Sequence, residues 1–130
     1  MTPGTVMFHD NFLFHDGSRA RKLFIILGCK DDRVLVAKTT SQNTNKSATP
    51  GCHSDDRFHN FYIEAGTGFN KDTWICLHEF YEFSSSEFSQ LSSDHSIHRI
   101  CNMTQQVLEE LTDCAKISDD ISPDQITIIE

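Results

Sequence analysis

The chain has 130 residues, of which 38% are hydrophobic and 23% are charged, and its formal net charge at pH 7 is −8. This length suits one domain, and the composition is that of a globular protein, which excludes a disordered or fibrous chain. The longest apolar run, residues 23–27, is too short to cross a bilayer, and the first residues lack the pattern of a signal peptide. We therefore expect one domain over residues 1–130, located in the cytoplasm and without a membrane partner.

The charge is unevenly distributed along the chain. Residues 1–50 contain seven Lys or Arg and four Asp or Glu, a net charge of +3, whereas residues 51–130 contain four and fifteen, a net charge of −11. A polyanion responds to the local field, so the N-terminal part can bind phosphate groups although the whole chain is acidic. The alternative is that these charged side chains only form water-exposed faces and that their uneven distribution is due to chance.

The first half of the chain predicts β-strands. β-Branched and aromatic residues predict strands at 6–8 and 21–27, and Gly28 is expected to end the second of them. The Asp-Asp pair that follows soon after forms a turn into a hairpin partner at 34–40. Residues 41–57 are rich in Ser, Thr, Asn, Pro and Gly, which predicts a long mobile loop.

The second half adds strands and ends in a helix. We expect a strand at 58–64, a long central strand at 73–83 and a short serine-capped helix at 84–91. The one long helix has Asn102 as its predicted N-cap, and its apolar residues recur every three or four positions. The acidic tail, residues 118–130, contains several isoleucines and predicts a last edge strand. Together these elements predict a mainly β, small barrel-like domain with a C-terminal α-helix.

The cysteines indicate reduced thiols. Their number is odd, they are widely spread and none forms a CxxC pair, which is typical of a cytosolic protein rather than of a disulfide framework. They are Cys29, Cys52, Cys76, Cys101 and Cys114.

Arg21 and Thr40 form the pair of residues that most suggests chemistry. Arg21 opens the first strand of the predicted hairpin and Thr40 closes the second, so the hairpin brings them together. A guanidinium beside a hydroxyl can hold a phosphodiester, because the guanidinium stabilises charge on the phosphate oxygens while the hydroxyl donates a hydrogen bond. Arg19, Lys22 and Lys38 add positive charge nearby. The alternative is a strand-edge cation near a threonine that favours strands.

Two histidine clusters raise the question of a metal. His95, His98 and Cys101 recur every three residues and would share one face only if their segment were helical. The second cluster comprises Cys52, His53 and His59. Neither spacing matches a structural zinc site, and the chain has no nucleotide-binding loop or nucleophile motif. We therefore expect no metal and no cofactor.

Six aromatic residues on the later strands have two possible uses. They could stack the bases of a nucleic acid, although core packing is the commoner use of aromatic residues on such strands. They are Phe58, Phe61, Tyr62, Trp74, Phe80 and Tyr81.

Several segments carry a family resemblance in chain order. Residues 3–6 read PGTV, and residues 16–27 read DGSRARKLFIIL, a loop that leads into a strand headed by Arg. Residues 33–42 read RVLVAKTTSQ, residues 71–79 read KDTWICLHE, and a helix begins at Asn102. This order of segments resembles the MazF/PemK toxins, the endoribonucleases of type II toxin–antitoxin pairs.

The resemblance implies a fold, an activity and partners. It implies an SH3-like β-barrel with a C-terminal helix, commonly a homodimer, that cleaves single-stranded RNA without a metal when the ribose 2′-hydroxyl attacks its own phosphate. The family's catalytic Arg and Thr fall on Arg21 and Thr40, and an antitoxin protein is the expected partner. The predicted RNA-binding residues around them are Arg19, Lys22, Lys38, Ser41 and Gln42.

Two other functions stay open at this point. One is a non-catalytic SH3-like module that binds a protein or peptide through an aromatic groove, which is favoured by the net charge and by Lys22, where the toxin family usually has proline. The other is a zinc-binding regulatory domain that uses His95, His98 and Cys101.

Overall fold

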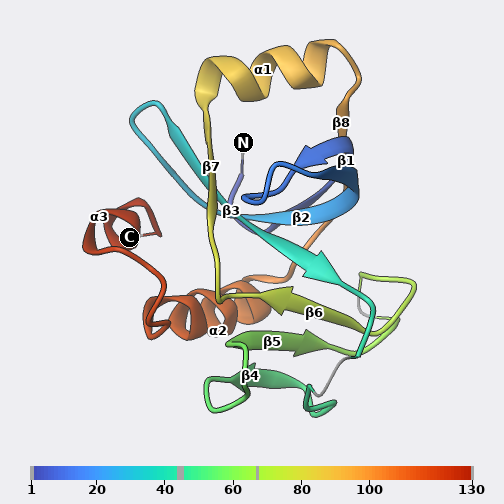
Figure 1. Cartoon of the computed structure of the whole chain (residues 1–130), viewed down its shortest axis with the longest axis vertical. Coiled ribbons are helices and arrows are strands. Elements are labelled where there is room, and N and C mark those ends of the chain that lie inside the picture. Colours follow the sequence, from blue (N-terminus) through green and yellow to red (C-terminus); the bar gives the residue numbers. More distant parts are fainter. Residues whose placement is uncertain (1, 44–45, 67, 130) are drawn as a thin grey trace.

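A computed structural model describes residues 2–43, 46–66 and 68–129 of the chain. Strands form most of its regular structure, and three helices lie around them (Figure 1). In chain order the elements are β1 (Thr5–Leu13), β2 (Arg19–Lys30), β3 (Arg33–Thr40), β4 (Gly51–His53), β5 (Asn60–Ile63), β6 (Thr73–Cys76), β7 (Tyr81–Ser84), α1 (Ser85–Ser93), β8 (Ile97–Asn102), α2 (Gln105–Lys116) and α3 (Pro123–Ile129). None of the described helices is long and apolar enough to cross a membrane.

The strands form one antiparallel sheet, which confirms the mainly β prediction. Their order is β4-β5-β6-β3-β2-β1-β8, and β7 pairs with β3 outside this path. One edge of β3 is therefore shared: its first half pairs with β7, and Thr39 and Thr40 at its end pair with β6. Over the described residues the sheet does not close on itself, because β4 and β8 are its two ends.

Both faces of the central hairpin are buried. Ile25 of β2 faces a hydrophobic cluster that includes residues from α2 and α3, whereas Ile26 faces a second cluster that includes residues from α1 and β7. The opposite strand alternates in the same way, with Leu35 in the first cluster and Val36 in the second. This two-sided burial explains why residues 23–27 form a continuous apolar run rather than an alternating one.

The predicted end of β2 at Gly28 is wrong, and so is the predicted edge strand in the tail. β2 continues to Lys30, with a register shift between Ile26 and Gly28, and the tail forms α3, whose backbone lies against Gly28. Ser122 caps this helix, because its hydroxyl accepts the Gln125 N–H at 3.0 Å while the Gln125 side chain accepts the Ser122 N–H at 3.1 Å. This reciprocal cap, followed by a proline in the first turn, favours a helix over a strand.

The predicted strand at 73–83 is two strands. β6 ends at Cys76 and β7 begins at Tyr81, because β3 offers separate stretches of its edge to each of them. His78 and Glu79 therefore lie between the two strands and not within one long strand. The predicted loop at 41–57 likewise contains a strand, β4, which pairs with β5.

The helix starts follow local capping. Ser84 caps α1 with Glu87 as its reciprocal partner, as the serine run predicts. Asn102 does not cap α2, because it ends β8, a strand that the sequence did not predict. Thr104 is the N-cap instead, and its hydroxyl accepts the Val107 N–H at 3.3 Å.

The expectation of reduced cysteines is also corrected. Cys52 of β4 and Cys114 of α2 form a disulfide across a sequence separation of 62 residues. Their Cα atoms are 5.6 Å apart, within the range that a disulfide spans. The pairing depends on the packing of α2 against β4, which the spacing of the cysteines does not reveal.

Candidate functional site

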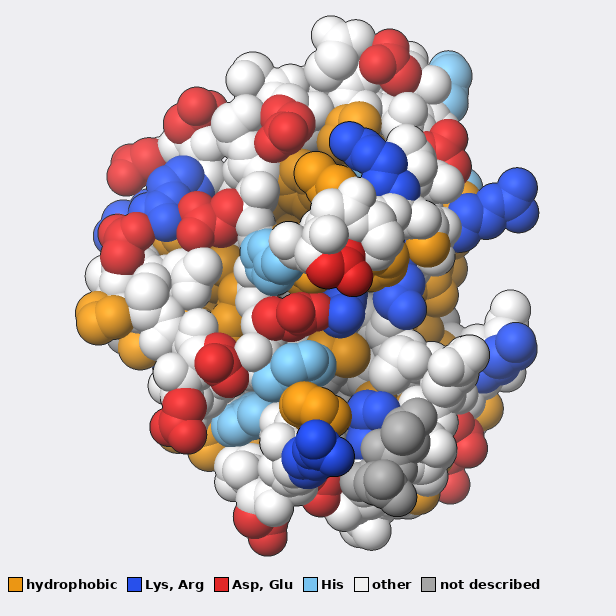
Figure 2. Space-filling view, in the orientation of Figure 1, with side chains coloured by type: hydrophobic (Ala, Val, Ile, Leu, Met, Phe, Trp, Pro, Cys, Tyr) orange, Lys and Arg blue, Asp and Glu red, His pale blue; other side chains and the backbone are white. Residues whose placement is uncertain are grey.

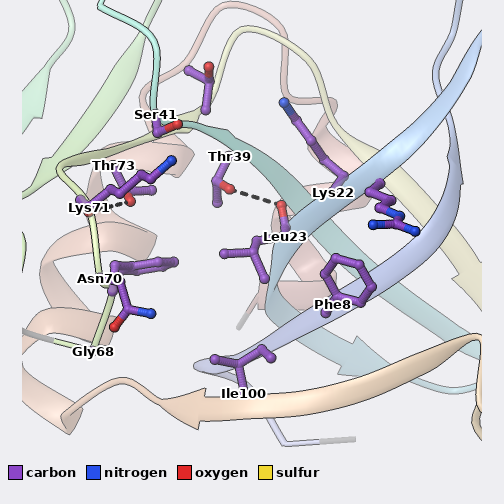
Figure 3. Close-up of a pocket in the computed structure, with 13 residues that line it drawn as sticks. Phe8, Lys22, Leu23, Thr39, Ser41, Gly68, Asn70, Lys71, Thr73 and Ile100 are labelled. Atoms are coloured by element: carbon purple, nitrogen blue, oxygen red, sulfur yellow. Dashed lines mark hydrogen bonds between the residues drawn. The ribbon is translucent and has the colours of Figure 1, made fainter.

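A cavity opens where β2 and β3 separate. The β2–β3 ladder runs from Lys30 opposite Arg33 to Phe24 opposite Lys38, and the next two residues of β3, Thr39 and Thr40, pair with β6. The Thr39 hydroxyl holds the separating strands by donating to the carbonyl oxygen of Leu23 at 2.9 Å (Figure 3). The cavity beside this bond has a volume of about 410 Å³.

The lining of this cavity is basic. It contains three cations, Arg21, Lys22 and Lys71, and no Asp or Glu among the described residues. Lys22 and Lys71 lie on opposite sides of the cavity in Figure 3. We call this site the basic cavity. The other residues that line it are Phe8, Leu23, Thr39, Thr40, Ser41, Gly68, Phe69, Asn70, Thr73 and Ile100.

Arg21 lies opposite a β-bulge. His9 pairs with Lys22 and Phe12 pairs with Ala20, so two residues of β1 face Arg21 alone. Bulges re-aim neighbouring side chains and increase the local twist of a strand, and they are common beside functional sites. The exposed side chain of Arg21 borders the basic cavity at this irregular point of the sheet.

Burial changes the acidity of Lys22. Its side chain is half-buried, and desolvation lowers the pKa of its ammonium group, an effect to which the positive charge of Lys38 adds. The Lys22 Nζ also lies 5.9 Å from the centre of the Phe14 ring. A lysine with a lowered pKa exchanges its proton closer to neutral pH than an ordinary lysine does.

Thr40 presents a hydroxyl at the same cavity. Its Oγ1 accepts the backbone N–H of Gln42 at 3.2 Å, which leaves the hydroxyl proton for a ligand. Arg21 and Thr40, the pair that the sequence singled out, both line the basic cavity. Lys22 and Ser41 line it as well.

Three of the predicted RNA-binding residues do not line the basic cavity. The Lys38 Nζ lies 2.5 Å from Glu79 Oε1 and 5.0 Å from the centre of the Phe14 ring, so a carboxylate neutralises its charge. Burial alone would raise the pKa of Glu79, but the hydrogen bonds from Lys38 and Tyr81 outweigh it and lower that pKa. Arg19 borders a different cavity, and Gln42 is outside the lining.

The second cavity is larger and aromatic. It has a volume of about 790 Å³ between the β1–β2 loop and β7, and its lining includes Phe14, His15 and Tyr81. The rings of His15 and Tyr81 stack with centres 4.0 Å apart and planes 6° apart. Burial raises the pKa of Tyr81 to about 12, so this hydroxyl stays protonated at neutral pH. We call this site the aromatic cavity.

The six aromatic residues of the later strands mostly belong to the core. Phe61, Tyr62, Trp74, Phe80 and Tyr81 are all buried, which agrees with the packing interpretation. Phe58 is the exception, because 41% of its surface is exposed.

The structure does not support a zinc site made by His95, His98 and Cys101. His98 and Cys101 lie in the strand β8, and His95 precedes it, so the three residues do not share a helical face. Among the described residues, a different group brings metal-binding side chains together, namely Cys52, His59 and Cys114.

No protein-family model matches this chain, and no curated protein matches it.

Proposed function

We propose that this protein binds single-stranded RNA in the basic cavity and cleaves it without a metal ion. One observation carries the proposal: a chain of net charge −8 concentrates three cations and no carboxylate around a single cavity of the described structure. The field inside such a cleft attracts phosphate groups even when the whole molecule is acidic. On the face shown in Figure 2, acidic side chains predominate on the left and basic ones are more frequent on the right.

The proposed reaction is an internal transesterification. The ribose 2′-oxygen attacks the adjacent phosphorus and loses its proton, the bond from phosphorus to the 5′-oxygen breaks, and the 5′-oxygen gains a proton. The products are a 2′,3′-cyclic phosphate and a 5′-hydroxyl. Negative charge grows on the non-bridging oxygens in the transition state, where a guanidinium stabilises it most effectively.

Each cavity residue has a distinct role in this proposal. Arg21 stabilises the phosphorane, Thr40 donates its hydroxyl proton to the scissile phosphate, and Lys22 exchanges a proton with the ribose or the leaving oxygen. No His, Asp or Glu lines the described cavity, so the lowered pKa of Lys22 makes it the best placed proton carrier there.

Other parts of the proposal rest on the resemblance alone. An SH3-like barrel, a homodimer, a cytoplasmic location and an antitoxin that covers the basic cavity are predictions of this kind. Growth arrest on induced expression in bacteria, relieved by a protein encoded beside it, would support the antitoxin.

The test compares wild-type protein with Arg21→Ala on a long unstructured RNA in EDTA. We expect the wild type to cut at discrete positions and to leave cyclic phosphate and 5′-hydroxyl ends. Arg21→Ala should lower kcat/KM by at least about 100-fold, the usual loss for one donor to a developing anion. The matched control is Arg57→Ala, which removes an exposed arginine outside the basic cavity. Absence of cleavage by the wild type would refute the enzymatic part.

Salt dependence tests the binding part separately. Three phosphate contacts predict a slope of about −2 in a plot of log affinity against log salt, since each contact to a single strand contributes about −0.7. Arg21→Ala should make the slope less steep by about 0.7, and Arg57→Ala should leave it unchanged. A slope near zero would place RNA elsewhere than in the basic cavity.

A second candidate function is a non-catalytic module that binds a peptide. The aromatic cavity favours it, because stacked rings around a large recess suit an extended apolar segment. In that case wild-type protein and Arg21→Ala would both leave RNA intact, and Phe14→Ala would weaken peptide binding while Arg21→Ala would not.

A further inference from the structure

The disulfide has a histidine beside it. The Nε2 atom of His59 lies 3.3 Å from the Sγ of Cys114 and 4.0 Å from the Sγ of Cys52. The ligand atoms of these three residues all lie within 4.8 Å of one another. In residues 2–43, 46–66 and 68–129, this is the one group of three or more His, Cys, Asp or Glu residues with such spacing. We call it the Cys2His cluster.

The donor atoms of the Cys2His cluster suit zinc. Thiolate sulfur and imidazole nitrogen are the ligands that Zn²⁺ takes in most protein sites, usually in tetrahedral geometry. A zinc–sulfur distance of about 2.3 Å would place the two sulfurs about 3.7 Å apart, so the ion needs the disulfide opened. The Cα atoms are 5.6 Å apart, and rotation about the two Cα–Cβ bonds separates the sulfurs without moving the backbone.

The surroundings provide access and a fourth position. Cys52 is exposed, whereas Cys114 is 2% exposed. A cavity of about 450 Å³ is lined by both cysteines and by Glu110 and Asp113 of α2. A water molecule or one of these carboxylates can therefore complete a tetrahedron, and the acidic lining attracts a cation.

His59 is already turned toward the sulfurs. In the oxidised form its Nε2–H donates to the carbonyl oxygen of Cys114 at 2.7 Å. A metal would replace this hydrogen bond, since the same nitrogen faces both partners. His59 immediately precedes β5, so its backbone is held by the sheet, and its own carbonyl accepts the Leu77 N–H at 2.9 Å.

We infer that reduction of the Cys52–Cys114 disulfide creates a Zn²⁺ site made by Cys52, His59 and Cys114. A cellular dithiol supplies two electrons and two protons: the S–S bond breaks, each cysteine gains a proton, and the dithiol becomes a disulfide. Zinc then binds the two sulfurs and the neutral imidazole, and both thiol protons are released to solvent. The site lies outside the basic cavity, and this inference does not rest on the proposed RNA cleavage.

Either form links the same two elements. The disulfide or the zinc ion holds β4 against α2, so the link between the middle of the chain and its C-terminal part persists in both redox states. The chain thus keeps this connection in a reducing compartment if zinc is available, which a disulfide alone does not provide.

The test uses the full chain, purified without a histidine tag, and Co²⁺ as a spectroscopic probe. Reduced protein should bind one equivalent of Co²⁺ with the absorption bands of a tetrahedral, thiolate-ligated ion, and Zn²⁺ should displace it. Oxidised protein should show no such bands. Cys52→Ser and His59→Ala should each weaken Zn²⁺ binding by at least about 100-fold, because loss of a residue that only supports a metal ligand already costs about 10–100-fold.

Two matched controls remove a similar side chain outside the cluster. His53→Ala removes an imidazole from the same strand as Cys52, and Cys101→Ser removes a thiol that is not in the disulfide. Both should bind Co²⁺ as the wild type does. Zinc should also raise the melting temperature of reduced wild-type protein and not that of the oxidised form. This measurement uses no variant, so it stays valid even if a variant folds poorly.

The outcomes separate clearly. Thiolate bands that vanish in Cys52→Ser and persist in the two controls support the site. Absence of these bands in reduced wild-type protein, or equal binding by the oxidised form, overturns it. Neither result depends on whether the protein cleaves RNA.

Discussion

Reduction of the Cys52–Cys114 disulfide should lower the free energy of unfolding by about 4 kcal/mol. The bond closes a loop of 62 residues, and the chain-entropy relation then gives about 14 cal/mol/K, or about 4 kcal/mol at 25 °C. The loss arises because the reduced unfolded chain has more conformations. Since small domains have about 5–15 kcal/mol of stability, the reduced protein should still fold.

Urea unfolding of oxidised and reduced protein measures this loss, with a chelator present so that zinc does not restore it. The slope of the unfolding free energy against urea should rise on reduction, because the unfolded chain without the cross-link exposes more surface. Cys52→Ser should reproduce the effect without a reductant, and Cys52 is the better choice because it is exposed, whereas Cys114 is buried. Cys101→Ser serves as the control.

Equal unfolding free energies for the oxidised and reduced protein would refute the reasoning. Such a result would mean either that the bond does not form in solution or that the reduced unfolded chain stays as compact as the oxidised one. Counting free thiols under denaturing conditions separates these two cases, since five titrate without the disulfide and three with it.

Two further predictions concern the core. Gly28→Ala should lower the free energy of unfolding, measured with urea, by about 1–3 kcal/mol, because the added Cβ would clash with the carbonyl oxygen of Ile128 in α3. As a control, Lys30→Ala at an exposed position should change it by less than about 0.5 kcal/mol. The free energy of unfolding should also fall as the pH drops below about 6.5. Burial lowers the pKa of His9 in the folded state, although the charge of Asp10 acts in the opposite direction. Below that pH the unfolded chain therefore binds more protons than the folded protein. His9→Gln should show a weaker dependence between about pH 7.5 and pH 5 in the same assay.

The central hairpin could be predicted because local signals agree there. The apolar run at 23–27 and its partner at 34–40 have strong strand preferences, and the Asp-Asp turn joins them in antiparallel register. The apolar stripe of α2 was also clear, since Leu111 and Cys114 are buried at the expected spacing. These features depend on neighbours in sequence, so a single chain reveals them.

Features set by distant contacts could not be predicted in this way. The split between β6 and β7 follows from the shared edge of β3, and the disulfide follows from the packing of α2 against β4. The α3 helix is a different case. Its signal is local, a capping pair of Ser122 and Gln125 with a proline between them, but the isoleucines of the tail also fit a strand.

The basic cavity depends both on local sequence signals and on contacts between distant parts of the chain. A hairpin continued in register from Phe24 opposite Lys38 would place Lys22, not Arg21, opposite Thr40, and the two strands would leave no gap between them. The cavity lies where this ladder ends: Thr39 and Thr40 pair with β6, and Thr39 bonds to Leu23 through its side chain. The residue types at the site were therefore visible in the sequence, whereas the space between them depends on where the β2–β3 ladder ends.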